Sequence, residues 1–516
     1  MNRTVAVLGS LALAMGLIVF PGVRADADSQ ITAASADDVA CGTPTDQGLI
    51  VYLDVEDTRA TPEAAGYRSA LVVFAPDGTE VHRVELQDFP TIFPLGAGCI
   101  VLGNTPNLGS FLFDPVSGTM LRLTVPADYD GDLFPLTGWQ RTYREHRWAF
   151  LTDNPATHAL LVDTQTGTTD DLVALVHTLR GGDGQIVVVL AAALSPDESS
   201  FLLMTDRDTW LVPTTDPSRA RQLPNAAPGQ ASFSEDGKRV LYVAATGETT
   251  TDVVAENLDG SGREVLAVDG RHASAYWVPG SNGRQVLLIR NQGEHPAAVT
   301  VMNGAERELA TFPDGSVVGA PMFSPSDRHV VLPARADHTA WFWIDLGNGT
   351  SRQLDELDGY AFPYAPYAPG VRWLEFFPSD TPIVQPGTSI LGLDLEAGTV
   401  TTLLTFDFDK PYAGILQVSS LGSSPDGRYV AVNDLGESYP RFWLLDAEKG
   451  TAKQYDGRLA GSFSPDGHNL IVSEPAGAAK VRPWRTLIMS VAGQDLRTLA
   501  VSVGRGGVWV PGTHAQ

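Results

Sequence analysis

The segment Phe463-Ser-Pro-Asp-Gly-His-Asn-Leu-Ile-Val472 contains the pattern that decides the fold. An apolar residue ends one β-rich run, Ser-Pro-Asp-Gly makes a turn, and a second β-rich run follows. Proline presets φ at the second turn position, aspartate hydrogen-bonds to its own backbone, and glycine tolerates a positive φ. The segment therefore predicts two adjacent antiparallel strands joined by a tight turn.

Related copies of this segment recur along the chain. Clear copies occupy residues 194–204, 233–242, 323–332 and 424–432, and weaker ones begin at Trp277, Phe377 and Trp509. The serines or their equivalents at 195, 234, 278, 324, 424 and 464 are separated by 39, 44, 46, 100 and 40 residues, and the copy at Phe377 divides the longest interval. Most copies are followed by a second apolar run that ends in another turn. A unit of this length with four short strands is the size of a propeller blade.

We count about ten blade-like units, which start near residues 48, 90, 138, 186, 230, 273, 319, 371, 415 and 460. The fold class predicted is all-β: a β-propeller built from about ten four-stranded blade-like repeats. Rings of four to eight blades are typical. One large ring, a seven- to eight-bladed propeller with β extensions, and two propellers therefore all remain open. The C-terminal run 506–510 is expected to complete the N-terminal unit and close the ring, while residues 170–180 predict either a short helix or a strand pair.

These repeats resemble the TolB-like, WD-like propeller repeats of exported bacterial proteins. The resemblance is clear over residues 186–516 and weaker over 48–185, which we interpret as divergent N-terminal blades. It covers the propeller part only, because the residues before Gly48 leave no room for the N-terminal α/β domain of TolB. Prolyl-oligopeptidase-like enzymes share the propeller, but the Gly-x-Ser-x-Gly elbow of their hydrolase domain does not occur in this sequence. The resemblance implies an architecture and no activity.

Residues 1–27 are predicted to be a cleaved signal peptide. Arg3 supplies one positive charge, an apolar run extends from Thr4 to Phe20, and Ala25-Asp26-Ala27 has the small-x-small pattern of a cleavage site. The run is about 17 residues, short for a membrane span. An uncleaved N-terminal anchor is the alternative. We expect an exported protein, periplasmic or extracellular, with no integral membrane segment after cleavage.

The chain has only two cysteines, Cys41 and Cys99. Cys41 lies in an acidic, Ala/Ser-rich leader of residues 28–47. In an oxidising compartment an isolated pair favours a disulfide, which would join this leader to the first β units. Two unpaired buried thiols are the alternative.

The charge of the chain is strongly one-sided. There are 61 acidic and 35 basic residues, a formal net charge of −26, and only five of the basic residues are lysines. Such a chain is unsuited to bind nucleic acid or an anionic lipid surface. An anionic surface favours a cationic partner, mainly through the association rate. We expect a monomer that binds a protein or a cell-surface ligand.

One acidic loop is a candidate metal site. Asp128, Asp130 and Asp132 place three carboxylates on alternate residues beside Gly131, and Ca²⁺ takes oxygen ligands from such loops. The loop departs from the EF-hand pattern, and a solvated acidic turn is the alternative. No other cofactor is expected, and a structural Ca²⁺ would make this a metal-stabilised propeller.

The most unusual stretch runs from Gly359 to Trp373 and is rich in tyrosine and proline. Tyr360, Tyr364, Tyr367 and Trp373 are our candidates for a ligand or partner surface, because aromatic side chains with a polar rim are typical of binding surfaces. The stretch is too rich in proline for a central strand. A loop packed across its own blade edge is the alternative.

The function predicted is therefore an exported, non-catalytic β-propeller that serves as a platform for protein or ligand binding. No residue is assigned a catalytic role, because no nucleophile elbow and no zinc-ligand spacing occurs in the sequence. The alternative is a propeller enzyme that acts on cell-surface glycan or peptide, with its site in the central funnel. Charged residues clustered at the centre would favour the enzyme, and apolar side chains there would favour the platform.

Overall fold

We analysed a computed structural model of the chain. It describes residues 45–516 apart from 58–66, 87–89, 96–100, 106–108, 127–132, 136–147, 153–157, 183–184, 248–249, 271, 291–295, 303–304, 336–338, 362–370, 379–386, 388, 407–415, 435–439, 477–482, 503–506 and 513–516.

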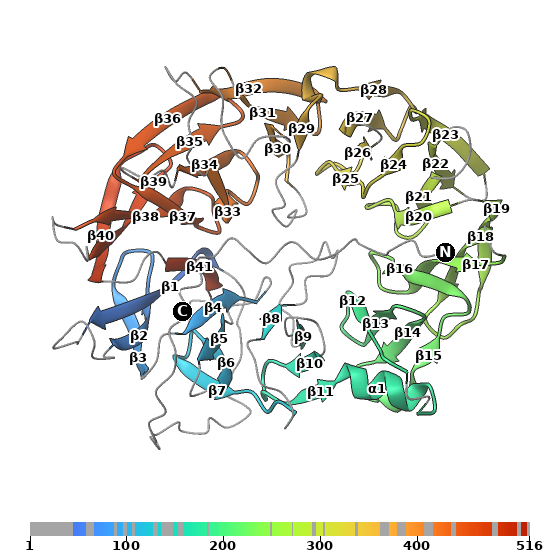
Figure 1. The fold of residues 1–516 in the computed structure, drawn as a ribbon, viewed down its shortest axis with the longest axis horizontal. Helices are drawn as coiled ribbons and strands as arrows, with labels where there is room; N and C mark the ends of the chain where they lie inside the picture. The colour runs from blue at the N-terminus through green and yellow to red at the C-terminus, as the bar shows by residue number, and fades with distance from the viewer. Residues whose placement is uncertain are drawn as a thin grey trace, which may run out of the picture. The chain divides into compact units, whose positions relative to one another are not determined.

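The described residues form ten small antiparallel sheets arranged as a ten-bladed propeller (Figure 1). We number the blades in chain order. Blades 1 to 4 contain β1 (Thr45–Asp57), β2 (Tyr67–Phe74) and β3 (Glu80–Leu86); β4 (Thr91–Pro94), β5 (Val101–Thr105), β6 (Gly109–Asp114) and β7 (Thr119–Arg122); β8 (Phe134–Pro135), β9 (Trp148–Thr152), β10 (Ala159–Asp163) and β11 (Thr169–Asp171); and β12 (Val189–Leu194), β13 (Ser200–Thr205), β14 (Thr209–Pro213) and β15 (Arg221–Gln222). Blades 5 to 7 contain β16 (Ala226–Phe233), β17 (Arg239–Ala245), β18 (Thr251–Asn257) and β19 (Glu264–Gly270); β20 (His272–Trp277), β21 (Gln285–Arg290), β22 (Ala297–Met302) and β23 (Ala305–Thr311); and β24 (Val317–Val318), β25 (Met322–Phe323), β26 (His329–Arg335), β27 (Thr339–Asp345) and β28 (Ser351–Gln353). Blades 8 to 10 contain β29 (Tyr360–Ala361), β30 (Trp373–Pro378), β31 (Ser389–Asp394) and β32 (Thr399–Thr405); β33 (Leu416–Ser423), β34 (Tyr429–Asp434), β35 (Arg441–Asp446) and β36 (Thr451–Asp456); and β37 (Leu459–Phe463), β38 (Asn469–Pro475), β39 (Trp484–Ser490) and β40 (Asp495–Ser502).

The last strand, β41 (Gly507–Gly512), belongs to blade 1. It pairs antiparallel with β1, Ile50 opposite Trp509, and gives the sheet order β3-β2-β1-β41. The two ends of the chain therefore share one blade, as the sequence predicted, and of the three arrangements left open the structure has the single ten-bladed propeller. In the other blades the first strand along the chain is the innermost one (Figure 1).

Two segments differ from a plain strand repeat. Residues 170–180 contain α1 (Leu172–Leu179), capped by Asp171, whose carboxylate accepts from the N–H groups of Val173 and Ala174, so the helix alternative is the one confirmed. The unit expected to start near residue 371 starts at β29, because the first residues of the Gly359–Trp373 stretch form the inner strand of blade 8. The 3₁₀ turns Pro217–Arg219 and Asp355–Leu357 complete the elements.

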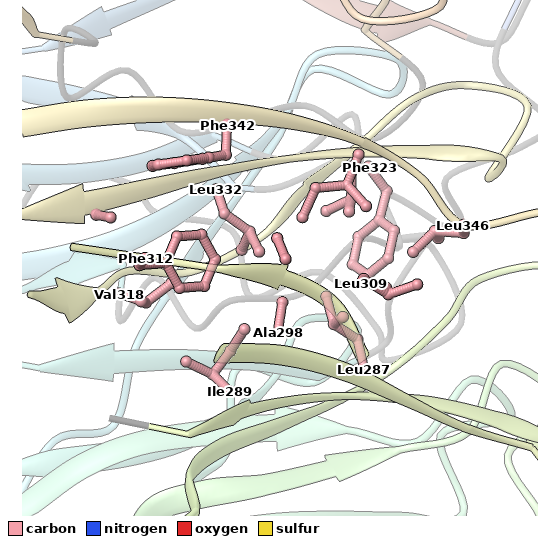
Figure 2. Close-up of a cluster of buried hydrophobic side chains, with 14 of the residues drawn as sticks. Leu287, Ile289, Ala298, Leu309, Phe312, Val318, Phe323, Leu332, Phe342 and Leu346 are labelled. Carbon is pink, nitrogen blue, oxygen red and sulfur yellow. The ribbon is translucent and has the colours of Figure 1, made fainter. Parts of the chain in front are cut away.

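The core lies between the blades, because both faces of each sheet are apolar. In β26, Val330 and Leu332 pack toward blade 6, whereas Val331 between them packs toward blade 8. Figure 2 shows the first of these interfaces, in which Phe312 and Phe342 meet edge to face with ring centroids 4.8 Å apart. Each blade therefore depends on the next for the burial of its side chains.

Buried amides and hydroxyls connect neighbouring blades near their inner strands: Asn433 and Asn104 lie on the second strands of their blades, and Ser462 lies on an inner strand. The Asn433 side chain of blade 9 donates to Ala460 O of blade 10 at 2.8 Å and accepts from Ala460 N at 2.7 Å. Asn104 of blade 2 makes the same two contacts with Leu133, which precedes the inner strand of blade 3. Across the closure, Trp509 N donates to Ser462 Oγ at 2.9 Å. These contacts satisfy backbone groups that a sheet edge leaves unpaired.

Substitution N433A removes both contacts with Ala460 and leaves a buried N–H and a buried carbonyl without them. We expect a loss of about 3 kcal/mol in the free energy of unfolding, measured by urea denaturation. The matched control is N348A, in an exposed turn, which should cost under about 1 kcal/mol. Equal effects of the two substitutions would contradict the role given to the buried Asn433 amide.

Candidate functional site

The Ser-Pro-Asp-Gly turns use their polar groups to hold the first two strands of a blade together. Ser424 Oγ donates to Asp426 Oδ1 at 2.6 Å and accepts from Tyr429 N at 2.8 Å. The turns at Ser195, Ser234 and Ser464 repeat both contacts. All four serines are buried. The most recognisable motif of the sequence is therefore structural.

The corresponding turn of blade 7 obtains its carboxylate from another blade. Here Ser326 occupies the aspartate position and Asp327, at φ 58°, occupies the glycine position. Glu396, in the turn after β31 of blade 8, accepts from Ser326 N at 2.7 Å and from Ser326 Oγ at 2.6 Å. Ser326 Oγ takes the contacts with Ser324 Oγ and Arg328 N that the aspartate makes in the other turns, and Glu396 adds a carboxylate to this turn from across the blade boundary.

The same carboxylate also contacts a histidine. His329 Nδ1 lies 3.1 Å from Glu396 Oε2 and its Nε2 lies 4.0 Å from Asp345 Oδ2. The ring stacks on Trp343 at 4.7 Å. Partial burial raises the pKa of Glu396, but the hydrogen bonds from Ser326 and His329 outweigh it and hold that pKa below its usual range.

The contact of Glu396 with Ser326 can be tested by removing the carboxylate from position 396 and placing one at position 326, where the other turns have an aspartate. E396A should cost about 1–2 kcal/mol of unfolding free energy, because Ser326 N and Oγ lose their acceptor. Adding S326D should restore about half of this loss or more. S326D alone should destabilise, because two carboxylates then face one another. Urea denaturation of the four chains checks this, and a double variant no more stable than E396A would contradict it.

Arginines of the outer strands link further blades. Arg307 of blade 6 donates to Leu346 O and Gly347 O of blade 7, and Arg352 of blade 7 donates to Gly398 O of blade 8. Arg221 of blade 4 reaches Leu258 O and the buried Glu256 of blade 5. These three arginines therefore each join their own blade to the one that follows it.

The inner strands lack the charged side chains that the turns and outer strands carry. None of the ten innermost strands in the described part of the chain contains Asp, Glu, Lys or Arg. Apolar side chains at the inner edge are exposed: Ile186 by 80%, Val188 by 39% and Leu190 by 44% in and just before β12, and Val317 by 64% in β24. We call Ile186, Val188 and Leu190 the inner stripe. Val187 and Val189 between them are buried, as expected for an extended segment with one packed face.

Most of the candidate residues from the sequence lie outside the described part of the chain. They are Cys41, Cys99, Asp128, Asp130, Asp132, Tyr364 and Tyr367. The disulfide, the Ca²⁺ loop, the signal peptide and the leader therefore stay predictions. Among the residues that are described, no group of three or more His, Cys, Asp or Glu side chains is placed to hold a metal ion. No described helix is long and apolar enough to cross a membrane.

Tyr360 and Trp373, the two described members of the aromatic set, lie on opposite faces of blade 8. Tyr360 packs into the cluster shared with blade 7, and its backbone O accepts from Trp341 Nε1 at 3.1 Å. Trp373 packs toward blade 9, with the guanidinium of Arg372 5.4 Å from its ring centroid. Both are half-buried. The structure does not bring these two rings together.

The same strand as Trp373 carries a buried carboxyl group, that of Glu375. Trp373, Glu375 and Phe377 alternate with Leu374 and Phe376, so Glu375 shares the face that packs against blade 9. It is 7% exposed, and its Oε1 has no hydrogen-bond partner among the described residues. Burial raises the pKa of Glu375 to about 8. The group is therefore mostly protonated at neutral pH.

Glu375 was not a candidate from the sequence. The only signal is a single glutamate in the run Trp373-Leu-Glu-Phe-Phe377, where alternation would have placed it on a buried face if the run had been read as a central strand. The weak repeat copy at Phe377 instead predicts a turn at this place, which conceals the strand.

Ionisation of Glu375 should lower the stability of the protein at alkaline pH. Its folded-state pKa lies above the ordinary value of 4.5, so folding disfavours the charged form, and stability falls as the pH rises from about 4.5 to about 8. E375Q should match the wild type at pH 4.5 and exceed it above pH 8 by up to about 5 kcal/mol.

The measurement is the unfolding free energy of wild type and E375Q between pH 4.5 and 9. The control E308Q, on the exposed outer strand β23, should leave the difference near zero at every pH. A pH-independent difference for E375Q would show that Glu375 does not titrate as its burial requires.

Comparison with known proteins finds the propeller in many solved structures. TolB from Acinetobacter baumannii is 17% identical, with 62% of this chain and 81% of that chain covered and a TM-score of 0.24. An oligogalacturonate lyase in complex with manganese is 12% identical over 62% and 94% of the two chains, with a TM-score of 0.37. A eukaryotic initiation factor is 11% identical over 82% and 99%, with a TM-score of 0.45. No family model and no curated protein matches. The resemblance to TolB-like propeller repeats is confirmed, and it concerns the fold.

Proposed function

We propose that this chain is an exported, non-catalytic propeller that binds a protein or a cell-surface ligand at the inner edge of its blades. The observation that carries the proposal is the pairing of uncharged inner strands with exposed apolar side chains at Ile186, Val188, Leu190 and Val317. Natural sheet edges usually carry charged side chains that discourage contact, and exposed apolar groups at an edge favour it.

The inner stripe is held in place by a buried ion pair. Arg180, just after α1, donates through Nε and Nη2 to both carboxylate oxygens of Asp208 at 2.9 and 3.0 Å, and through Nη2 to Thr205 Oγ1. The backbone groups of Asp206 and Val188 meet at 3.0 Å, which ties the stripe to this hairpin. A surface fixed in this way loses little conformational entropy on binding.

The test is capture by immobilised protein that begins at Asp28. Wild type is compared with the triple variant I186S/V188S/L190S and with V265S, whose valine is exposed on an outer strand. Binders from the envelope extract of the source cells are recovered at low and moderate salt and identified by mass spectrometry. We expect one stoichiometric protein from wild type and V265S and at least tenfold less from the triple variant.

Varying the salt concentration separates the contribution of the acidic surface from that of the inner stripe. The acidic surface should speed association, so capture should slow at moderate salt, while the inner stripe should set the amount retained at equilibrium. Retention of cell-wall glycan with no protein partner would exclude a protein platform, and cleavage of the retained glycan would overturn the non-catalytic role and support the alternative, an enzyme acting on glycan or peptide. Equal capture by all three chains would exclude the inner stripe as the contact.

A further inference from the structure

The outermost strand of blade 8 differs in charge from the outermost strands of the other blades. This strand, β32, forms the outer edge of its sheet (Figure 1). Its sequence from Thr399 to Thr405 is Thr-Val-Thr-Thr-Leu-Leu-Thr, without Asp, Glu, Lys or Arg. Each of the nine other outermost strands in the described part of the chain contains at least one of these residues. Charged side chains on an edge strand discourage its pairing with another chain. The edge of blade 8 lacks this protection.

The side chains of β32 leave a polar, uncharged surface at this edge. β32 pairs with β31 on one side, and no other described strand pairs with it. Leu403 is buried against blade 9 and Val400 packs toward blade 7, whereas Thr399 and Thr402 are exposed. The apolar side chains are thus used at the blade interfaces. The edge presents N–H and C=O groups for strand pairing without the exposed apolar patch that causes unspecific aggregation.

A second copy of the same edge is the partner that β32 fits. Two antiparallel β32 strands related by a twofold axis place only Thr, Val and Leu opposite one another, so no like charges meet across the strands. β-branched and threonine pairs stabilise adjacent strands. The joint sheet contains the eight strands of two blades, and the pairing ends at two copies because each edge is used once.

The surroundings of β32 carry both signs of charge. The chain has a net charge of −26 and only five lysines. Two of these, Lys449 and Lys453, lie in the turn and on the outer strand β36 of blade 9, which contacts β32. On the side of blade 7, Arg352 lies 3.7 Å from Glu356. Contact between two copies can therefore bring opposite charges together at this place, although the chain as a whole is acidic.

We propose that this chain forms a weak homodimer in which the β32 edges of two copies pair antiparallel. The inference goes beyond the proposed function, because it concerns the outer edge of blade 8 and not the inner stripe. It replaces the monomer expected from the net charge.

The dimer is weak because its contact is short. The register of β32 with β31 shifts at Leu403, so the regular part of the strand is 399–402. Two such segments bury less than the roughly 1,200 Å² of a stable interface. The net charge also opposes the contact at low ionic strength. Salt screens this repulsion, so the dimer should strengthen as the salt concentration rises, which is the reverse of the effect on capture of a cationic partner.

The test is sedimentation equilibrium of the chain from Asp28 over a range of protein concentrations. We expect a reversible dimer whose dissociation constant falls about tenfold or more between about 20 and about 300 mM NaCl. T399K/T402K should raise the dissociation constant about tenfold or more, although it lowers the net negative charge, because lysine side chains then oppose one another across the strands. The control T311K/T498K makes the same change of charge at exposed threonines on β23 and β40, and it should not weaken the dimer.

A mixing experiment tests whether the two β32 edges face each other. T399K/T402K and T399E/T402E should each be mainly monomeric when alone. An equimolar mixture should form heterodimers at least as strong as the wild-type dimer, because lysine on one edge then faces glutamate on the other. A general loss of repulsion between acidic chains would not require the two partners to be different variants.

Three results would overturn the proposal. They are a wild type that stays monomeric at every concentration and salt, a T399K/T402K dimer as strong as that of the wild type, and a mixture that stays monomeric. Because Thr399 and Thr402 are exposed, the variants should fold, with melting temperatures close to that of the wild type. Should T399K/T402K melt early, T402K and T402E provide the second pair of variants for both experiments.

Discussion

The structure depends on the burial of both faces of every blade by its neighbours. A strand such as β26 directs Val330 and Leu332 to one interface and Val331 to the other, so no blade has a solvent face of the usual alternating kind. An open array would leave two apolar faces exposed at its ends. The shared blade of β1 and β41 removes those ends, and Ile50, Tyr52, Ile471 and Trp509 pack across the closure. Ring closure is therefore a condition for the fold and not an addition to it.

Given that constraint, the repeats are less independent than their sequences suggest. The turn at Ser324 lacks its own aspartate and uses Glu396 of the next blade, while the outer-strand arginines Arg307 and Arg352 bind the turns of the blades that follow them. A substitution in one repeat thus changes the hydrogen bonding of another. Such contacts add specific hydrogen bonds to the apolar packing through which each repeat depends on its neighbours.

The sequence predicts contacts within one turn, but it does not predict contacts between blades. Ser-Pro-Asp-Gly at Ser424 or Ser464 predicts its turn because the turn is made within four residues, and the C-terminal strand was predicted because ring closure demands a partner for β1. The start of blade 8 was misplaced because Tyr360 and Ala361 stand in a proline-rich run that does not look like a strand. Glu396 could not be predicted, since its partner Ser326 lies 70 positions away. The burial of Glu375 follows from alternation only once its run is recognised as a central strand, and the apolar blade face that covers it cannot be seen in the sequence.

Glu375 is different in kind from every other carboxyl group discussed. Glu396, Asp208 and Asp446 each have a pKa held below the ordinary value by hydrogen bonds, so their charge stabilises the fold. Glu375 has its pKa raised by burial, so at neutral pH and above its presence destabilises the fold. A leucine or glutamine at this place would pack at lower cost. Its burial between blades 8 and 9 therefore lowers the stability of the interface that encloses it, and the loss is largest at alkaline pH, where the carboxyl group must either ionise in an apolar surrounding or stay protonated against the solution.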